Sequence, residues 1–169
     1  MAEAEQFKVS LSMTQPPARC LILACGNTLR GDDGVGLWLA AWAERRFANQ
    51  AEIKIIARQQ WTPELAEDVA CAESVLFIDC SVDSAPGSIK LTPVEPSACG
   101  QGIATHHSGA AELLALARDY YSSQPHNAQL LTIGAGSTAL GEAFSDAVAT
   151  ALPEACKRLE ETVLRFLAL

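Results

Sequence analysis

Two adjacent carboxylates, Asp32 and Asp33, lie in a glycine-rich stretch at residues 26–36 whose sequence is GNTLRGDDGVG. The glycines allow a sharply folded loop whose backbone can approach another chain or a ligand closely. The stretch has neither the G-x-G-x-x-G pattern nor a G-K-[ST] end, and carboxylates repel phosphate, so a phosphate-binding loop is disfavoured. A cation, or a polar substrate held through a cation, fits this loop better.

One of the two carboxylates can have a plainer role as the N-cap of the helix that follows. There it would accept hydrogen bonds from backbone N–H groups and interact favourably with the helix dipole. Because adjacent residues cannot both be the cap, the other carboxylate stays available. The loop therefore offers at least one carboxylate to a cation or a substrate.

A third carboxylate, Asp79, follows the apolar run SVLFI, and the histidine pair His106 and His107 comes just before an amphipathic helix predicted over residues 108–121. A carboxylate after a strand can simply be a turn residue, and a histidine at a helix start is usually solvated. However, parallel strands joined by a βαβ crossover end at the same edge of a sheet. This brings Asp79 towards the loop with two carboxylates, and histidine is a common metal ligand beside carboxylates.

The elements that must position these residues alternate along the chain. Apolar runs predict strands, and apolar periods near 3.6 residues predict helices. The first strand, CLILAC, is apolar throughout, which is typical of a central parallel strand, and the fourth contains proline, which places it at an edge. The alternation predicts a three-layer α/β/α sandwich with a five-stranded, mostly parallel sheet. The predicted strands cover residues 20–25, 52–57, 74–78, 88–94 and 129–133, and the predicted helices cover residues 35–47, 62–72, 108–121 and 145–167.

Whole-chain properties limit the classes of protein. The 169 residues, of which 49% are hydrophobic, predict a single α/β domain over residues 19–169 after a flexible leader over residues 1–18. The formal net charge of −8, without a basic patch, disfavours a nucleic-acid partner. The leader lacks the basic and apolar regions of a secretory signal, and no apolar run is long enough to span a membrane. The six cysteines form no C-x-x-C pair, which indicates free thiols in a reducing cytoplasm.

From about residue 19 to residue 167 the chain resembles the hydrogenase maturation endopeptidases, the proteases that trim the C-terminal extension of the large subunit of nickel–iron hydrogenases. The stretch GNTLRGDDGVG is similar to the family's G-N-x-L-x-x-D-[DE]-G-x-G. An apolar strand ends in aspartate in SVLFID, and a histidine opens a later helix in THHSGAAELL. The chain departs from the pattern after the second predicted strand, where many relatives carry D-G-G-T and this sequence has QQWTPEL.

The resemblance implies a cytoplasmic peptidase, of the type called an aspartyl-type endopeptidase, that acts on a nickel–iron hydrogenase large-subunit precursor. It assigns the family's three catalytic, metal-contacting positions to Asp33, Asp79 and His106. His106 is preferred to His107 because the pattern has a glycine three residues after the ligand. The rest of the loop is expected to contact the substrate through Gly26, Asn27, Asp32 and Gly34.

Two carboxylates and an imidazole form a ligand set of oxygen and nitrogen with open positions, which suits Ni²⁺ or Zn²⁺. The resemblance implies that nickel arrives bound to the precursor and is the element recognised, with zinc or cadmium able to replace it in vitro. Two other hypotheses remain open. One is a small metallohydrolase with a permanent zinc, and the other is a non-catalytic assembly chaperone that binds the nickel-loaded large subunit without cutting it.

Overall fold

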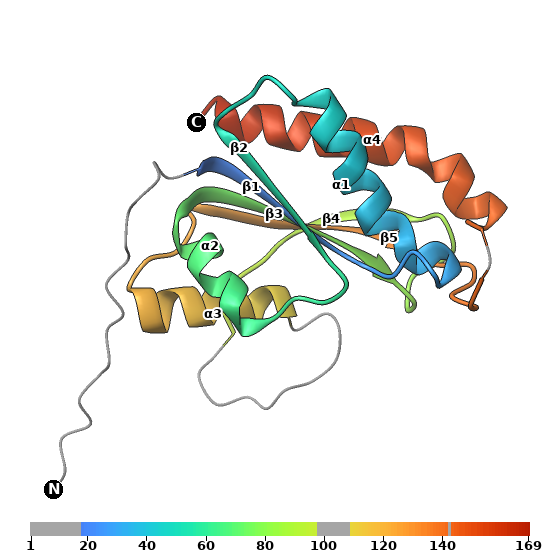
Figure 1. Ribbon diagram of the computed structural model, residues 1–169, viewed down its shortest axis with the longest axis horizontal. Helices are drawn as coiled ribbons and strands as arrows, with labels where there is room; N and C mark the ends of the chain where they lie inside the picture. Colours follow the sequence, from blue (N-terminus) through green and yellow to red (C-terminus); the bar gives the residue numbers. More distant parts are fainter. Residues whose placement is uncertain (1–17, 98–108, 142) are drawn as a thin grey trace, which may run out of the picture.

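The computed structural model describes residues 18–97, 109–141 and 143–169, in which strands and helices alternate except that the third and fourth strands follow each other directly (Figure 1). The strands are β1 (Ala18–Cys25), β2 (Ile53–Arg58), β3 (Ala72–Ser81), β4 (Ile89–Pro93) and β5 (Asn127–Gly134). The helices are α1 (Val35–Arg46), α2 (Ala66–Ala70), α3 (Gly109–Tyr121) and α4 (Asp146–Leu167). Two 3₁₀ turns, η1 (Gly31–Gly34) and η2 (Pro63–Leu65), precede α1 and α2.

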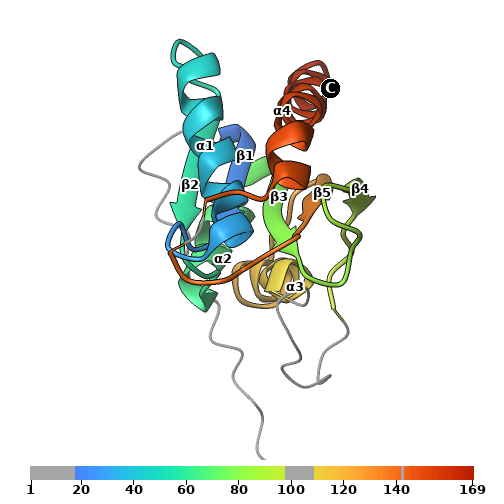
Figure 2. The same cartoon turned by 90° about the vertical axis from the view of Figure 1, so that its right-hand side faces the viewer.

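The five strands form one sheet with the order β2-β1-β3-β5-β4. In this order the neighbouring strands β2, β1, β3 and β5 are parallel, and β4 pairs antiparallel with β5 at the edge. Figure 2 shows α1 and α4 on one side of this sheet and α2 and α3 on the other. The predicted three-layer sandwich with a mostly parallel sheet is thus confirmed, and so is the edge position of the proline-containing strand.

Two apolar cores, one on each face, hold the layers together. Successive side chains of a strand point to opposite faces. In β1, Cys20, Ile22 and Ala24 pack in the core under α1 and α4, whereas Leu21 and Leu23 pack in the core under α2 and α3. All five are completely buried, which explains why this strand is apolar without interruption.

Two elements differ by more than two residues at an end from their predicted extents, whereas the others differ by one or two. β3 continues to Ser81, so Asp79 lies inside the strand, paired with Thr132 of β5, rather than after it. The polar end of β3 stays in the ladder because β5 runs beside it as far as Gly134. The helix predicted over residues 62–72 is a 3₁₀ turn followed by the five-residue α2, because the chain must enter β3 at Ala72.

The leader predicted over residues 1–18 falls outside the described residues except for Ala18, which opens β1. Within the described parts of the chain, no helix has the length and apolar character needed to cross a membrane. Four of the cysteines are buried free thiols, and Cys71 is a partly exposed one.

Candidate functional site

The glycine-rich loop after β1 is sharply folded, as the sequence predicts. Asn27 N–H donates to the Asp33 carbonyl at 3.1 Å, and Asp33 N–H donates to the Arg30 carbonyl at 3.1 Å. Gly26 has φ +148°, and a Cβ atom there would lie 2.0 Å from the Asp33 carbonyl oxygen. Only glycine fits such a position, so the loop folds back on itself at Gly26 and presents η1 at the carboxyl edge of the sheet.

Asp33 and Asp79 come to this edge from different elements. The last pair in the register of β1 and β3 is Ala24 with Ile78, and Cys25 and Asp79 are the next residues of the two strands. The start of α1 packs directly on the same strand ends, because a Cβ atom on Gly36 would lie 2.1 Å from the Cys25 carbonyl oxygen and 3.3 Å from that of Ile78. Asp33 precedes this point by less than one helical turn, and its side chain is half-buried, while Asp79 is 6% exposed.

The negative charge at this edge affects the pKa values of two buried thiols, Cys25 and Cys80. Burial raises the pKa of the Cys25 thiol, and the charge of Asp79, a hydrogen bond to its carboxylate and the charge of Asp33 raise this pKa further. Burial, followed by the charges of Asp33 and Asp79, raises the pKa of Cys80 to about 12. Both predicted carboxylates therefore act electrostatically on these two thiols. Both thiols are protonated at neutral pH, which makes them poor nucleophiles.

The third predicted ligand, His106, and its neighbour His107 lie outside the described residues. α3 begins just after them at Gly109, where a Cβ atom would lie 3.0 Å from the Trp61 ring. That ring also packs edge-on against Phe77 of β3, with 5.3 Å between the ring centroids. The segment that departs from the family pattern thus braces the start of α3. Among the described residues, no cluster of three or more histidine, cysteine or acidic side chains can hold a metal ion, so Asp33 and Asp79 supply only the carboxylate part of the predicted set.

Asp32 has a different environment from its neighbour Asp33. Its carboxylate is completely buried and accepts hydrogen bonds from the N–H groups of Gly136 at 2.7 Å, Ser137 at 2.9 Å and Ser145 at 2.7 Å. It also accepts one from the Ser145 hydroxyl at 2.8 Å. Burial alone would raise the pKa of Asp32, but these hydrogen bonds outweigh it and hold the pKa below its ordinary value.

The helix-cap hypothesis is wrong for both carboxylates, because the N-cap of η1 is Arg30 and that of α1 is Gly34. The Asp32 carboxylate is also closed to solvent, so it acts inside the loop rather than on its surface. The sequence offered one signal for this role, namely a serine at the first position of the helix predicted over residues 145–167. That serine, Ser145, caps α4 by accepting from Val148 N–H while its hydroxyl donates to Asp32.

The other loop residues named by the sequence shape the turn. The Asn27 side chain accepts a hydrogen bond from Leu29 N–H at 2.9 Å, which is an Asx turn. Gly34 is buried, and a Cβ atom there would lie 3.0 Å from the Thr28 Cα atom. These contacts keep the loop narrow beside η1.

Several solved structures with this architecture are described as hydrogenase maturation proteases. The hydrogenase maturating endopeptidase HybD from E. coli aligns with a TM-score of 0.74 and 22% sequence identity, over 87% of this chain and 93% of that chain. The nickel–iron hydrogenase maturation proteases HybD and HycI from Thermococcus kodakarensis align with TM-scores of 0.64 and 0.61 and identities of 24% and 23%. The former alignment covers 85% of this chain and 98% of that chain, and the latter 90% and 94%.

The chain has the fold of the hydrogenase maturation endopeptidases. The resemblance inferred from the three sequence motifs is confirmed at this level. No family model matches the sequence, and no curated protein matches it significantly. The identities near one fifth explain why short motifs, rather than overall sequence similarity, carry the resemblance.

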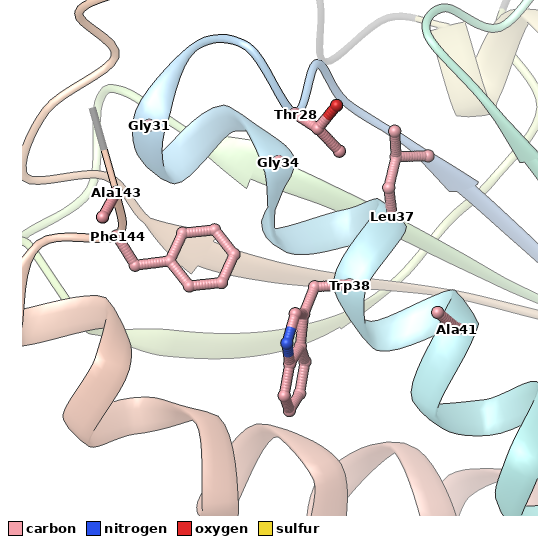
Figure 3. Close-up of a pocket in the computed structure, with 8 residues that line it drawn as sticks. All are labelled: Thr28, Gly31, Gly34, Leu37, Trp38, Ala41, Ala143 and Phe144. Carbon is pink, nitrogen blue, oxygen red and sulfur yellow. The ribbon is translucent and has the colours of Figure 1, made fainter. Parts of the chain in front are cut away.

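In this endopeptidase fold an apolar pocket of about 390 Å³ lies next to the glycine-rich loop. Figure 3 shows the ring of Phe144, from the loop before α4, near the ring of Trp38 from α1. Gly31 and Gly34, which flank the two adjacent aspartates, also line the pocket. Its size and lining suit an apolar side chain of a bound peptide. The pocket is lined by Thr28, Gly31, Gly34, Leu37, Trp38, Ala41, Ala143 and Phe144.

Proposed function

We propose that this protein is a cytoplasmic endopeptidase that removes the C-terminal extension of a nickel-loaded precursor of a nickel–iron hydrogenase large subunit. The observation that carries the proposal is the position of Asp33 and Asp79 at the carboxyl edge of the sheet in a hydrogenase maturation endopeptidase fold. In parallel α/β sheets this edge is the usual place for a ligand. The names of the structural neighbours support a peptidase and a hydrogenase precursor as its substrate.

The donor set fits a divalent cation carried by the substrate. Asp33 and Asp79 bring two oxygen ligands and two negative charges to one place, and His106 is proposed as the nitrogen ligand. Nickel bound to the precursor is part of the substrate and would supply a Lewis acid beside the scissile peptide. In vitro, zinc or cadmium would suit the same ligands.

The two carboxylates differ in what they can do. Asp79 is almost fully buried and accepts a hydrogen bond from Cys80 N–H at 2.7 Å, so its carboxylate is oriented by the strand. Asp33 is half-buried and thus open to water as well as to a ligand. We assign to Asp79 the holding of the substrate-borne cation, and to Asp33 both a share of this binding and the role of accepting a proton from the attacking water.

A thiol nucleophile does not fit this site. Cys25 and Cys80 are the cysteines nearest to the carboxylates, and their raised pKa values keep them protonated at neutral pH. Hydrolysis by water, assisted by a carboxylate base, is therefore the route that the local electrostatics favour. Inhibitors that alkylate thiols should leave the activity unchanged.

The deciding experiment incubates the purified protein with a large-subunit precursor, loaded with nickel or free of it, and measures the mass of the precursor's C-terminus. We expect truncation of the loaded precursor only. Equal truncation of both forms would show that nickel is not the element recognised. A stable complex with an uncut precursor would favour the assembly chaperone. Stoichiometric zinc in the purified protein, with hydrolysis of small substrates, would favour the metallohydrolase.

A further inference from the structure

The loop that carries Asp33 is joined side by side to the loop between β5 and α4, more than a hundred residues later in the chain. Besides accepting four hydrogen bonds through its carboxylate, Asp32 donates its own N–H to the Ser137 carbonyl at 2.9 Å. Gly141 N–H donates to the Leu29 carbonyl at 2.8 Å. Gly31 has φ +49°, and a Cβ atom there would lie 2.9 Å from the Ser137 carbonyl oxygen, so the two loops approach as closely as glycine permits.

The Asp32 carboxylate is the centre of this junction. It accepts hydrogen bonds from three backbone N–H groups and one hydroxyl near the edge of the sheet. Hydrogen bonds to an ionised acceptor are stronger than those between neutral groups. Among the ion pairs of the described residues none involves Asp32, so these donors alone balance its charge.

The same short turn fixes Asp33. Asp33 N–H donates to the Arg30 carbonyl at 3.1 Å, and its own carbonyl accepts from Asn27 N–H at 3.1 Å. Asp32 links this turn to the junction, because its backbone is part of η1 while its side chain is hydrogen-bonded to the loop before α4. A change in the position of Asp32 must therefore move the turn that aims Asp33.

We propose that Asp32 is a positioning residue: its buried carboxylate clamps the turn of η1 to the loop before α4 and thereby sets where the Asp33 carboxylate lies relative to Asp79. Its effect on catalysis rests on the proposed function, whereas its effect on the turn does not. Displacement of a reacting group by about 1 Å can cost about 100-fold in rate, so a clamp of this kind acts mainly on kcat.

The test is chemical rescue of Asp32→Ala. The substitution leaves a hole of carboxylate size lined by backbone N–H groups, which formate can fill. We expect kcat for precursor cleavage to fall about 100-fold in Asp32→Ala, with a smaller change in KM. Formate should raise the kcat of this variant about tenfold or more. Asp32→Asn keeps the shape of the side chain but sets an amide NH₂ against N–H donors. This variant should fold, show a smaller fall in kcat than Asp32→Ala, and gain no activity from formate.

Thr162→Val is the matched control. Thr162 is also buried, and its hydroxyl donates to the Arg158 carbonyl at 2.8 Å within α4, away from the junction. This variant removes a buried polar group outside the junction, and it should keep its kcat and show no response to formate. If formate stabilises Asp32→Ala without restoring kcat, Asp32 is only structural and the proposal is overturned.

A second readout needs no substrate, so it separates this proposal from the proposed function. Amide hydrogen exchange of the enzyme alone should show faster exchange at Asn27 and Asp33 in Asp32→Ala, together with Gly136 and Ser145, and formate should slow all four. Faster exchange confined to Gly136 and Ser145 would show that the clamp does not hold the turn. If the wild-type protein cut no precursor, the proposed function would fail while this measurement still decided the role of Asp32.

Discussion

On the two faces of the sheet the helices are held by completely buried apolar side chains, whereas at its carboxyl edge the loops before α1 and α4 are held by hydrogen bonds to one carboxylate. Apolar burial stabilises without fixing direction, while hydrogen bonds fix the orientation of the groups that make them. The difference indicates a division of labour. The faces set the stability of the domain, and the edge sets the geometry of the site.

The largest effect expected at the edge is loss of activity without loss of fold. Asp79→Asn removes the charge of a nearly buried carboxylate but keeps its shape, so the free energy of unfolding should change little or even rise. Cleavage of the nickel-loaded precursor should become undetectable, because the substrate-borne cation loses a ligand. Thermal unfolding and C-terminal mass measurement on the same sample check both parts. A variant that unfolds readily would assign Asp79 to the structure rather than to the site.

The largest effect expected on a face is the reverse. Leu76 of β3 is completely buried in the core under α1 and α4. Leu76→Ala should lower the free energy of unfolding by about 2–5 kcal/mol, since it removes apolar contacts and leaves a cavity. At a temperature where the variant is still folded, kcat should stay within about twofold of the wild-type value. Denaturant unfolding measures the free energy of unfolding, and cleavage kinetics measure kcat. A much larger fall in kcat would contradict the view that the faces set stability while the edge sets the geometry of the site.

Gly26→Ala probes the boundary between the two regions. The new Cβ atom would meet the Asp33 carbonyl oxygen at 2.0 Å in a backbone conformation that alanine avoids, so the loop must shift. A residue held in such a conformation costs about 1–3 kcal/mol. We expect a stability loss of this size together with a fall in kcat. Gly87→Ala is the matched control, because Gly87, between β3 and β4, also has positive φ, +72°, and a Cβ atom there would lie 2.6 Å from the Ala147 carbonyl oxygen. Equal loss of kcat in both variants would argue against a specific effect on Asp33.

The same contrast explains how much of the molecule the sequence could predict. The faces were predictable because burial on both sides forces an uninterrupted apolar run, as in β1, and because one apolar period defines α4. Asp79 was found for a similar reason, since it follows such a run. The last residues of β3 were not predicted, because their pairing depends on β5, nearly fifty residues later, and their polar side chains carry no apolar pattern.

The edge was only partly predictable. The glycines and the two aspartates of the loop predicted a tight turn with carboxylates, but nothing in the local sequence distinguishes the role of Asp32 from that of Asp33. What distinguishes them is the loop before α4, three of whose N–H groups donate to Asp32 from more than a hundred residues away. Backbone donors leave no trace in the sequence, so the role of Asp32 becomes visible only in the folded structure. The roles of Asp33, Asp79 and His106 in binding a cation stay predictions, and His106 lies outside the described residues.

The smallest expected effect concerns Phe144, which belongs to both regions. Its ring packs against the core under α1 and α4 from the side and also lines the pocket beside the glycine-rich loop. Phe144→Ala should therefore enlarge the pocket at a modest cost in stability. If an apolar side chain of the precursor occupies the pocket, KM should rise up to about tenfold, which corresponds to about 1.4 kcal/mol, while kcat changes little. Leu164→Ala, at a half-exposed position on α4 that does not line the pocket, should leave KM unchanged. An unchanged KM in Phe144→Ala would show that the pocket does not contribute to substrate binding. A fall in kcat at constant KM would show that apolar packing, and not only the hydrogen bonds of Asp32, positions the residues at the carboxyl edge.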